Sequence, residues 1–167
     1  MKTLTLIRHA KSSWKYPELS DFDRPLNKRG KKNAPYMGER IAKQNISPDR
    51  IITSPANRAL ATAKMIAKAI KYPSKELVAD QRVYLSNARD LVAVLRKVKD
   101  SCKEVFLVGH NPSLTDLAND LTGESIENVP TTGVVRIQFD LDSWAQVAQN
   151  SGKLVLFDYP KKKRPED

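Results

Sequence analysis

Three short apolar runs, each followed by a stretch with helical spacing, place the strongest constraint on how this chain can fold. The runs lie at residues 4–7, 50–53 and 105–108. Each has the length of a buried strand, and strands that alternate with helices are typical of a parallel sheet. We therefore predict an α/β fold, with a mostly parallel central sheet and helices on both of its faces.

The first two helical stretches have recognisable faces and starts. In the first, Ala34, Met37 and Ile41 fall on one side. The second has an apolar stripe over residues 59–70, and Ser54 lies where an N-cap is needed. Both stripes can pack against a sheet, which supports the alternating pattern.

Two further helices are predicted in the second half of the chain. One fits residues 88–98. The other fits residues 112–122, with Asn111 as its cap and Gly123 as its end. The apolar run at 105–108 precedes the last of these helices and completes the third repeat of the pattern.

The end of the chain changes character. Residues 134–139 and 154–159 are predicted as strands that form an antiparallel pair at one edge of the sheet. We expect a single domain over residues 1–160, followed by a solvated basic tail at 161–167.

Composition narrows the class of protein. Apolar residues make up 40% and charged residues 29% of the 167 residues, as in soluble globular proteins. No stretch approaches the roughly 20 apolar residues of a bilayer span. The first residues lead directly into a strand, so we expect no signal peptide and a cytoplasmic protein.

Cysteine, histidine and net charge limit the chemistry. Cys102 is the single cysteine, and the two histidines are far apart in the sequence, so we expect no disulfide, no metal site and no cofactor. The formal net charge of +10 favours anionic partners, which include phosphoesters, nucleic acid and acidic protein surfaces. Charge alone does not choose among them.

The two histidines both follow apolar runs. His9 comes directly after the first strand, His110 after the third, and Ser54 after the second. Because ligands of open parallel sheets bind at the carboxyl ends of the strands, these three residues are expected to meet at one site. We consider Ser54 a helix cap rather than a second nucleophile.

Positive charge is predicted at the same sheet edge. Arg8 precedes His9, Arg58 lies in the first turn of the second helix, and a helix begins just after His110. Guanidinium groups and a helix N-terminus together bind a tetrahedral dianion well. The sequence therefore predicts a phosphate pocket.

Histidine chemistry then suggests separate roles for the pair. A nucleophilic histidine offers one neutral ring nitrogen to phosphorus while an acceptor holds the other, and His9 is the candidate. A second histidine can remain protonated and stabilise charge on the transferring group, and His110 fits that role.

These residues resemble the signature of a known family. Leu6-Ile7-Arg8-His9-Ala10 is similar to the Arg-His-Gly/Ala motif of the histidine phosphatase superfamily. Residues 53–59 resemble its Ser-Pro-x-x-Arg-Ala segment, and 108–112 resemble its second-histidine motif. Short length, and Asp23-Arg24-Pro25-Leu26 before the first helix, point to the small SixA-type phosphohistidine phosphatases.

The resemblance implies a fold, an activity and a site. The fold would be the phosphoglycerate mutase-like three-layer sandwich, and the enzyme a metal-independent phosphatase that passes through a phosphohistidine on His9. Arg8, Arg58 and His110 would form the phosphate pocket, with Arg24 and Asn111 as further contacts. The partner would be a phosphohistidine-containing protein, and a histidine phosphotransfer domain is the expectation at the level of the family.

One departure from larger relatives bears on the substrate. Phosphoglycerate mutases carry a glutamate proton donor in an inserted segment, whereas residues 83–88 here contain no carboxylate. A phosphoester needs a proton for its departing alkoxide, but a phosphoramidate can leave as neutral imidazole, so the absence favours a P–N bond. Asp21 or Asp23 could supply a proton from the loop, although an approach to the helix or solvation explains either better.

Two other functions stay open from the sequence. One is a small-molecule phosphomonoesterase or mutase of the same superfamily. The other is a phosphate-binding or nucleic-acid-binding module without catalysis, which the net charge suggests. Charge does not explain the placement of the two histidines, so we rank this alternative last.

Overall fold

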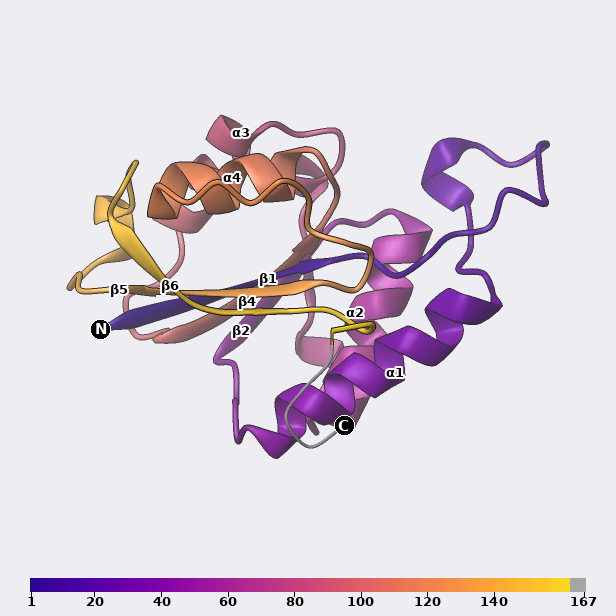
Figure 1. Cartoon of the computed structure of the whole chain (residues 1–167), viewed down its shortest axis with the longest axis horizontal. Coiled ribbons are helices and arrows are strands. Elements are labelled where there is room, and N and C mark those ends of the chain that lie inside the picture. The colour runs from indigo at the N-terminus through magenta and orange to yellow at the C-terminus, as the bar shows by residue number, and fades with distance from the viewer. Residues whose placement is uncertain (163–167) are drawn as a thin grey trace.

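The structure is a computed structural model that describes residues 1–162, and its centre is a six-stranded sheet with helices on both faces (Figure 1). Along the sheet the strands lie in the order β3-β2-β4-β1-β5-β6. The strands are β1 (Lys2–Arg8), β2 (Arg50–Thr53), β3 (Val78–Ala79), β4 (Glu104–Gly109), β5 (Val134–Phe139) and β6 (Gly152–Asp158). The α-helices of the described residues are α1 (Lys28–Lys43), α2 (Asn57–Ala69), α3 (Ala88–Arg96) and α4 (Ser113–Thr122).

The pairing of the strands confirms the predicted sheet. β1, β2 and β4 are parallel, whereas β5 and β6 pair antiparallel and extend the sheet beyond β1. The strand β3 was not predicted, because its two residues are too few to form a hydrophobic pattern. In Figure 1, α3 and α4 cover one face of the sheet, and α1 and α2 cover the other.

The central strand explains the layers. Leu4 and Leu6 of β1 are buried in the apolar cluster under α3 and α4, whereas Ile7 belongs to the cluster that includes Met37 of α1. Successive side chains of a strand point to opposite faces, so one buried strand supplies both cores. The carboxyl end of β1 is thereby fixed between two packed layers.

Helix ends differ from the sequence prediction at three helices. The helix α4 begins at Ser113 with Pro112 as its N-cap residue and no side-chain cap, so the predicted cap at Asn111 is wrong, and α3 ends at Arg96 rather than at residue 98. Gly123 ends α4 with φ 75, and Asn87 caps α3 in a reciprocal pair with Asp90. The helix α2 begins later than predicted, with Ala56 as its N-cap residue and no side-chain cap. The predicted cap at Ser54 is therefore wrong, because the N-cap position falls two residues later; the Ser54 hydroxyl accepts from the N–H of Ala56 at 3.2 Å, just before the helix.

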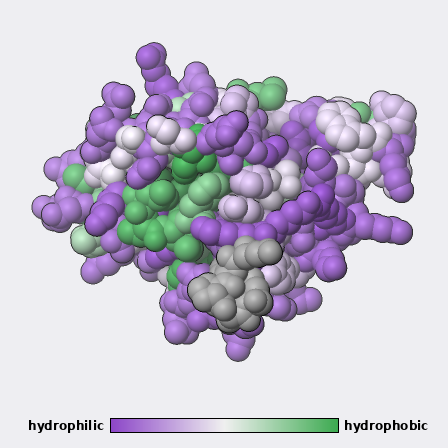
Figure 2. Space-filling model, viewed as in Figure 1, coloured by the Kyte–Doolittle hydropathy of each residue, from purple (hydrophilic) through white to green (hydrophobic). Residues whose placement is uncertain are grey.

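The surface shows one apolar region on the face seen in Figure 2. Hydrophobic surface gathers over the edge strand β6, where Val155 is 42% exposed. Among residues 1–162 no helix is long and apolar enough to cross a membrane. The predicted basic tail lies outside the described residues from position 163 onward.

Candidate active site

Strand register brings the two histidines together. Arg8 pairs with Gly109 across β1 and β4, so the next residue of each strand lies at the same edge. The N–H of His9 donates to the carbonyl oxygen of Gly109 at 3.0 Å. The centroids of the His9 and His110 rings are 5.1 Å apart. The sheet thus places both imidazoles at a single site.

The ring of His9 is buried and neutral. Its Nδ1 lies 2.8 Å from the carbonyl oxygen of Ala10. Because a carbonyl only accepts, Nδ1 carries the proton and Nε2 keeps its lone pair. Burial, with smaller contributions from His110 and the nearby arginines, lowers the pKa of His9 to about 3. His9 therefore has the state that a nucleophile needs.

The backbone next to His9 is held by Thr62 of α2. The N–H of Ala10 donates to Oγ1 of Thr62 at 2.9 Å, and this hydroxyl donates to the carbonyl oxygen of Arg58 at 2.7 Å. Thr62 lies in α2, one turn after Arg58. It therefore links the end of β1 to the helix that carries Arg58.

Ser54 contacts His110 for the same topological reason. The N–H of Ser54 donates to the carbonyl oxygen of Val108 at 3.0 Å, which continues the pairing of β2 with β4. Its Oγ lies 2.8 Å from Nε2 of His110. The same Oγ accepts from the N–H of Ala56 at 3.2 Å, so Ser54 links the second histidine to the start of α2.

The pKa of His110 bears on the protonated role that the sequence predicts for it beside a bound dianion. Burial and, to a smaller extent, Arg58 lower the pKa of His110 to about 4, while Asp21 opposes the shift. At neutral pH the ring is neutral unless a bound dianion offsets its desolvation. A protonated His110 therefore requires that a proton arrive together with an anionic ligand.

Buried polar atoms without a partner gather at this edge of the sheet. Within the described part of the chain they are Arg8 Nε, His110 Nδ1 and Thr132 Oγ1. Nη1 of Arg8 donates to the carbonyl oxygen of Val129 at 3.0 Å, which fixes the guanidinium and leaves Nε free. Buried polar groups are normally satisfied, so this concentration marks a place for an oxygen-rich ligand.

Asp21 has more contacts with the site than its position in the sequence predicts. Arg58 donates from Nη1 to the Asp21 carbonyl oxygen at 2.7 Å, and from Nη2 to Oδ2 at 3.1 Å. Arg24 donates to Oδ1 at 3.2 Å, and the Tyr84 hydroxyl donates to Oδ2 at 2.7 Å. The Tyr84 hydrogen bond, together with both arginines, lowers the pKa of Asp21 to about 2. This carboxylate is ionised at neutral pH and cannot donate a proton there.

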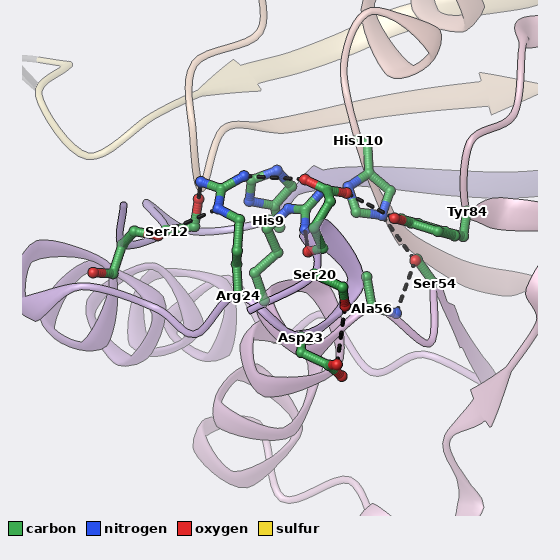
Figure 3. Close-up of polar contacts among 12 residues, drawn as sticks. His9, Ser12, Ser20, Asp23, Arg24, Ser54, Ala56, Tyr84 and His110 are labelled. Atoms are coloured by element: carbon green, nitrogen blue, oxygen red, sulfur yellow. Dashed lines mark hydrogen bonds and ion pairs between the residues drawn. The ribbon is translucent and has the colours of Figure 1, made fainter. Parts of the chain in front are cut away.

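Arg24 reaches the site from the loop before α1. It is buried, and its guanidinium donates to the carbonyl oxygen of Ser13 and to the hydroxyl of Ser12 (Figure 3). Its Cζ lies 3.3 Å from the ring centroid of Trp14, a residue that is 76% exposed. The sequence placed Arg24 near the phosphate, but only the fold shows that serine, aspartate and tryptophan hold it.

Two hollows open onto this arrangement. One, of about 260 Å³, is lined by His9, Arg8, Arg24 and Arg58 among others. The second, of about 490 Å³, is lined by His110, Tyr84, Leu85, Asp21 and Arg58 among others. Arg58 lines both, and its contact with Asp21 lies between them. Arg58 is therefore in a position to contact a phosphoryl group that lies between the two histidines.

Known proteins share this architecture. The family model described as histidine phosphatase superfamily (branch 1) matches residues 4–82, which contain Arg8, His9 and Arg58. A SixA protein of Agrobacterium tumefaciens, named as a phosphohistidine phosphatase, superposes with a TM-score of 0.82 at 25% identity, over 95% of this chain and 98% of that chain. The chain belongs to the histidine phosphatase superfamily, and it is of the SixA type.

Two further proteins are similar to this chain, one in sequence and one in fold. An uncharacterized protein of Mycobacterium tuberculosis is 28% identical over 166 residues, which cover 93% of this chain and 100% of that protein. A mycobacterial glucosyl-3-phosphoglycerate phosphatase shares the fold alone, with a TM-score of 0.66 at 13% identity over 95% of this chain and 98% of that chain. The fold of this histidine phosphatase is thus shared with a protein named for a small substrate.

In this histidine phosphatase Asn111 holds a loop. Its side-chain nitrogen donates to Oδ1 of Asn128 at 2.9 Å and to the carbonyl oxygen of Val129 at 3.0 Å. Its side-chain oxygen accepts from the N–H and the hydroxyl of Thr115. A direct contact between Asn111 and phosphate would break these bonds, so its geometry fits positioning better than binding.

The loop before β5 completes the SixA-type site. Thr132 has φ 62, which is unusual for a β-branched residue, and its N–H faces the carbonyl oxygens of both Arg8 and His9 at 3.0 and 3.2 Å. This backbone fixes the direction in which β1 ends. No three of His, Cys, Asp or Glu within residues 1–162 lie where they could share a metal ion.

Proposed function

We propose that this phosphatase of the histidine phosphatase superfamily removes phosphate from phosphohistidine on a partner protein, through a phosphohistidine on His9. The observation that carries the proposal is that the site, within residues 1–162, has no protonated carboxyl group. Asp21 is the only carboxylate among the described residues that line the two hollows, and its pKa is about 2. An alkoxide leaving group would find no protonated carboxyl group, whereas phosphohistidine needs none.

The first chemical step uses the free ring nitrogen. Nε2 of His9 attacks phosphorus while the P–N bond of the substrate breaks, and the electron pair stays on the substrate nitrogen. When the other nitrogen of the substrate ring carries a proton, the product is neutral imidazole. The Nδ1 proton of His9, held by Ala10, stabilises the positive ring that forms.

The second step releases the product. Water attacks phosphorus of phospho-His9, and the P–N bond breaks with its electron pair on Nε2 of His9. The protons of the water stay on the phosphate, which departs as inorganic phosphate and leaves His9 neutral. Arg8 and Arg58 hold the non-bridging oxygens in both steps, and His110 donates to them after it takes up a proton. Arginine and histidine neutralise the transferred group, so we propose a reaction that needs no metal.

Turnover and trapping test the proposal. Purified protein is given a phosphohistidine peptide and a panel of phosphoesters, and the peptide is expected to be the better substrate. Labelled substrate should leave acid-labile phosphate on the wild type and none on His9→Ala, which should have no activity. Lys64→Ala, an exposed change in α2, serves as the control. Full activity of His9→Ala would refute the mechanism.

A small-molecule phosphomonoesterase is the second candidate. It is favoured by the shared fold with a mycobacterial glucosyl-3-phosphoglycerate phosphatase and by hollows large enough for a small ligand. A strong preference for one ester of the panel over the phosphohistidine peptide would make this the better assignment.

A further inference from the structure

A third hollow adjoins the one that contains His9. It has a volume of about 250 Å³ and shares Lys11 and Thr131 with its neighbour. Its far wall is formed by Arg29 in the first turn of α1, and by Tyr159 and Lys161 after β6. We call this hollow the basic groove. A chain that carried its phosphohistidine to His9 could continue past Lys11 into the basic groove.

All the charged residues that line the basic groove are positive. Lys11, Arg29 and Lys161 are exposed, and no carboxylate lines the groove among the described residues. None of the three forms an ion pair within residues 1–162. Arg24 and Arg58 differ, because Asp21 pairs with both. In Figure 2, hydrophilic surface extends over this region, around the start of α1.

We propose that the basic groove binds an acidic segment of the phosphoprotein substrate, with carboxylates close in sequence to the phosphohistidine. The inference rests on the proposed function. Three unpaired cations attract carboxylates, and Tyr159 and Pro160 add an apolar wall that a polypeptide can contact. A nucleic acid fits less well, because single strands bind on several aromatic platforms and the groove offers one ring.

Binding tests the groove separately from catalysis. The probes are two fluorescent peptides without phosphate, one with glutamates around a central histidine and one with glutamines instead. They are titrated into His9→Ala, with and without the pair Arg29→Glu and Lys161→Glu. The acidic peptide should bind ~10-fold more tightly than the neutral one, and the added pair should remove this preference, because reversal replaces attraction by repulsion.

Matched changes and salt control for non-specific charge. Lys64→Glu with Lys68→Glu alters the net charge equally, at exposed positions of α2 outside the groove, and should preserve most of the preference. The preference should fall with added salt, because exposed charges are screened over about 8 Å at physiological ionic strength. Equal loss in both double variants would overturn the proposal. Displacement of the peptide by an equal concentration of RNA would assign the groove to nucleic acid and would also overturn it.

Turnover separates the two proposals. With His9 intact, Arg29→Glu with Lys161→Glu should raise KM for an acidic phosphohistidine peptide by ~10-fold, with kcat unchanged and hydrolysis of free phosphoramidate unchanged. If phosphoramidate and peptides are not hydrolysed but the binding preference is present, the proposed function fails and the docking site stands. If they are hydrolysed without any acidic preference, the docking proposal fails alone.

Discussion

The two sides of the proposed phosphate pocket are built in different ways. On one side, β1, β2 and β4 end together, and main-chain register places His9, Ser54 and His110. On the other, residues 13–24 contribute Arg24 and Asp21 through ion pairs, and the Asp21 side chain is 48% exposed. Strand register cannot change without unfolding the sheet, whereas an exposed ion pair contributes little and can exchange partners. The sheet side fixes the chemistry, and the loop side can adjust to the ligand.

Arg58 belongs to both sides, so its removal should have the largest effect. Its backbone is tied to β1 through Thr62, and its guanidinium holds Asp21. Arg58→Ala should lower kcat/KM for phosphoramidate by ~10³-fold, the effect of losing a preorganised donor to the transferring group. Arg58→Lys keeps the charge without the forked geometry and should recover only part of the rate.

The control for Arg58 is another paired arginine outside the site. Arg82 pairs with Asp80 at 2.7 Å on the surface, and Arg82→Ala should retain full activity. Thermal unfolding of each variant shows whether the fold persists. Normal kcat/KM in a folded Arg58→Ala protein would remove Arg58 from the phosphate pocket.

The same comparison explains what could be predicted from the sequence. Apolar runs determine strands, and parallel strands end at one edge, so His9 and His110 could be placed together without coordinates. Asp21 could not, because its role depends on residues from three separate segments with no periodicity. Serine suits a helix cap and a polar site equally, so only the start of α2 decided against the cap at Ser54. The neutral state of His110 depends on burial, which the local sequence does not reveal.

On the sheet side, the binding of an anion should depend on pH through the protonation of His110. The pKa of His110 is about 4 in the empty site, and a bound dianion raises it, so binding takes up a proton. Sulfate, which stays a dianion throughout, should bind about tenfold more weakly for each unit that the pH rises between the pKa of the free site, about 4, and the higher pKa of the complex, and the dependence should level off above the latter. Below pH 4 the free site is protonated as well, and the dependence should level off.

Sulfate inhibition from pH 5 to 9 measures this linkage. His110→Asn should remove most of the slope while Arg8 and Arg58 still bind the anion. An equal slope in His110→Asn would assign the proton to another group, and a flat wild-type profile would show that His110 stays neutral in the complex.

A third, smaller effect is expected at Ser54. Ser54→Ala removes the hydroxyl that lies 2.8 Å from Nε2 of His110, so the ring loses its fixed orientation. We expect kcat/KM to fall by ~10-fold, within the range for a residue that acts through a catalytic neighbour. Ser113→Ala is the matched control, because its hydroxyl donates to the backbone carbonyl oxygen of His110 and not to the ring. Equal losses in both variants would indicate a general effect on the loop.

The smallest effect should come from the loop side, at Asp21. Asp21→Asn removes the negative charge that competes with an anionic ligand for Arg58 and Arg24, so sulfate should bind ~3-fold more tightly, a modest change because the carboxylate is half exposed. Asp23→Asn is the matched control, since Asp23 accepts a hydrogen bond from Ser20 and forms no ion pair with the arginines among the described residues. Weaker sulfate binding in Asp21→Asn alone would mean that Asp21 holds Arg58 in place, and the loop would then be as rigid a part of the pocket as the strand ends.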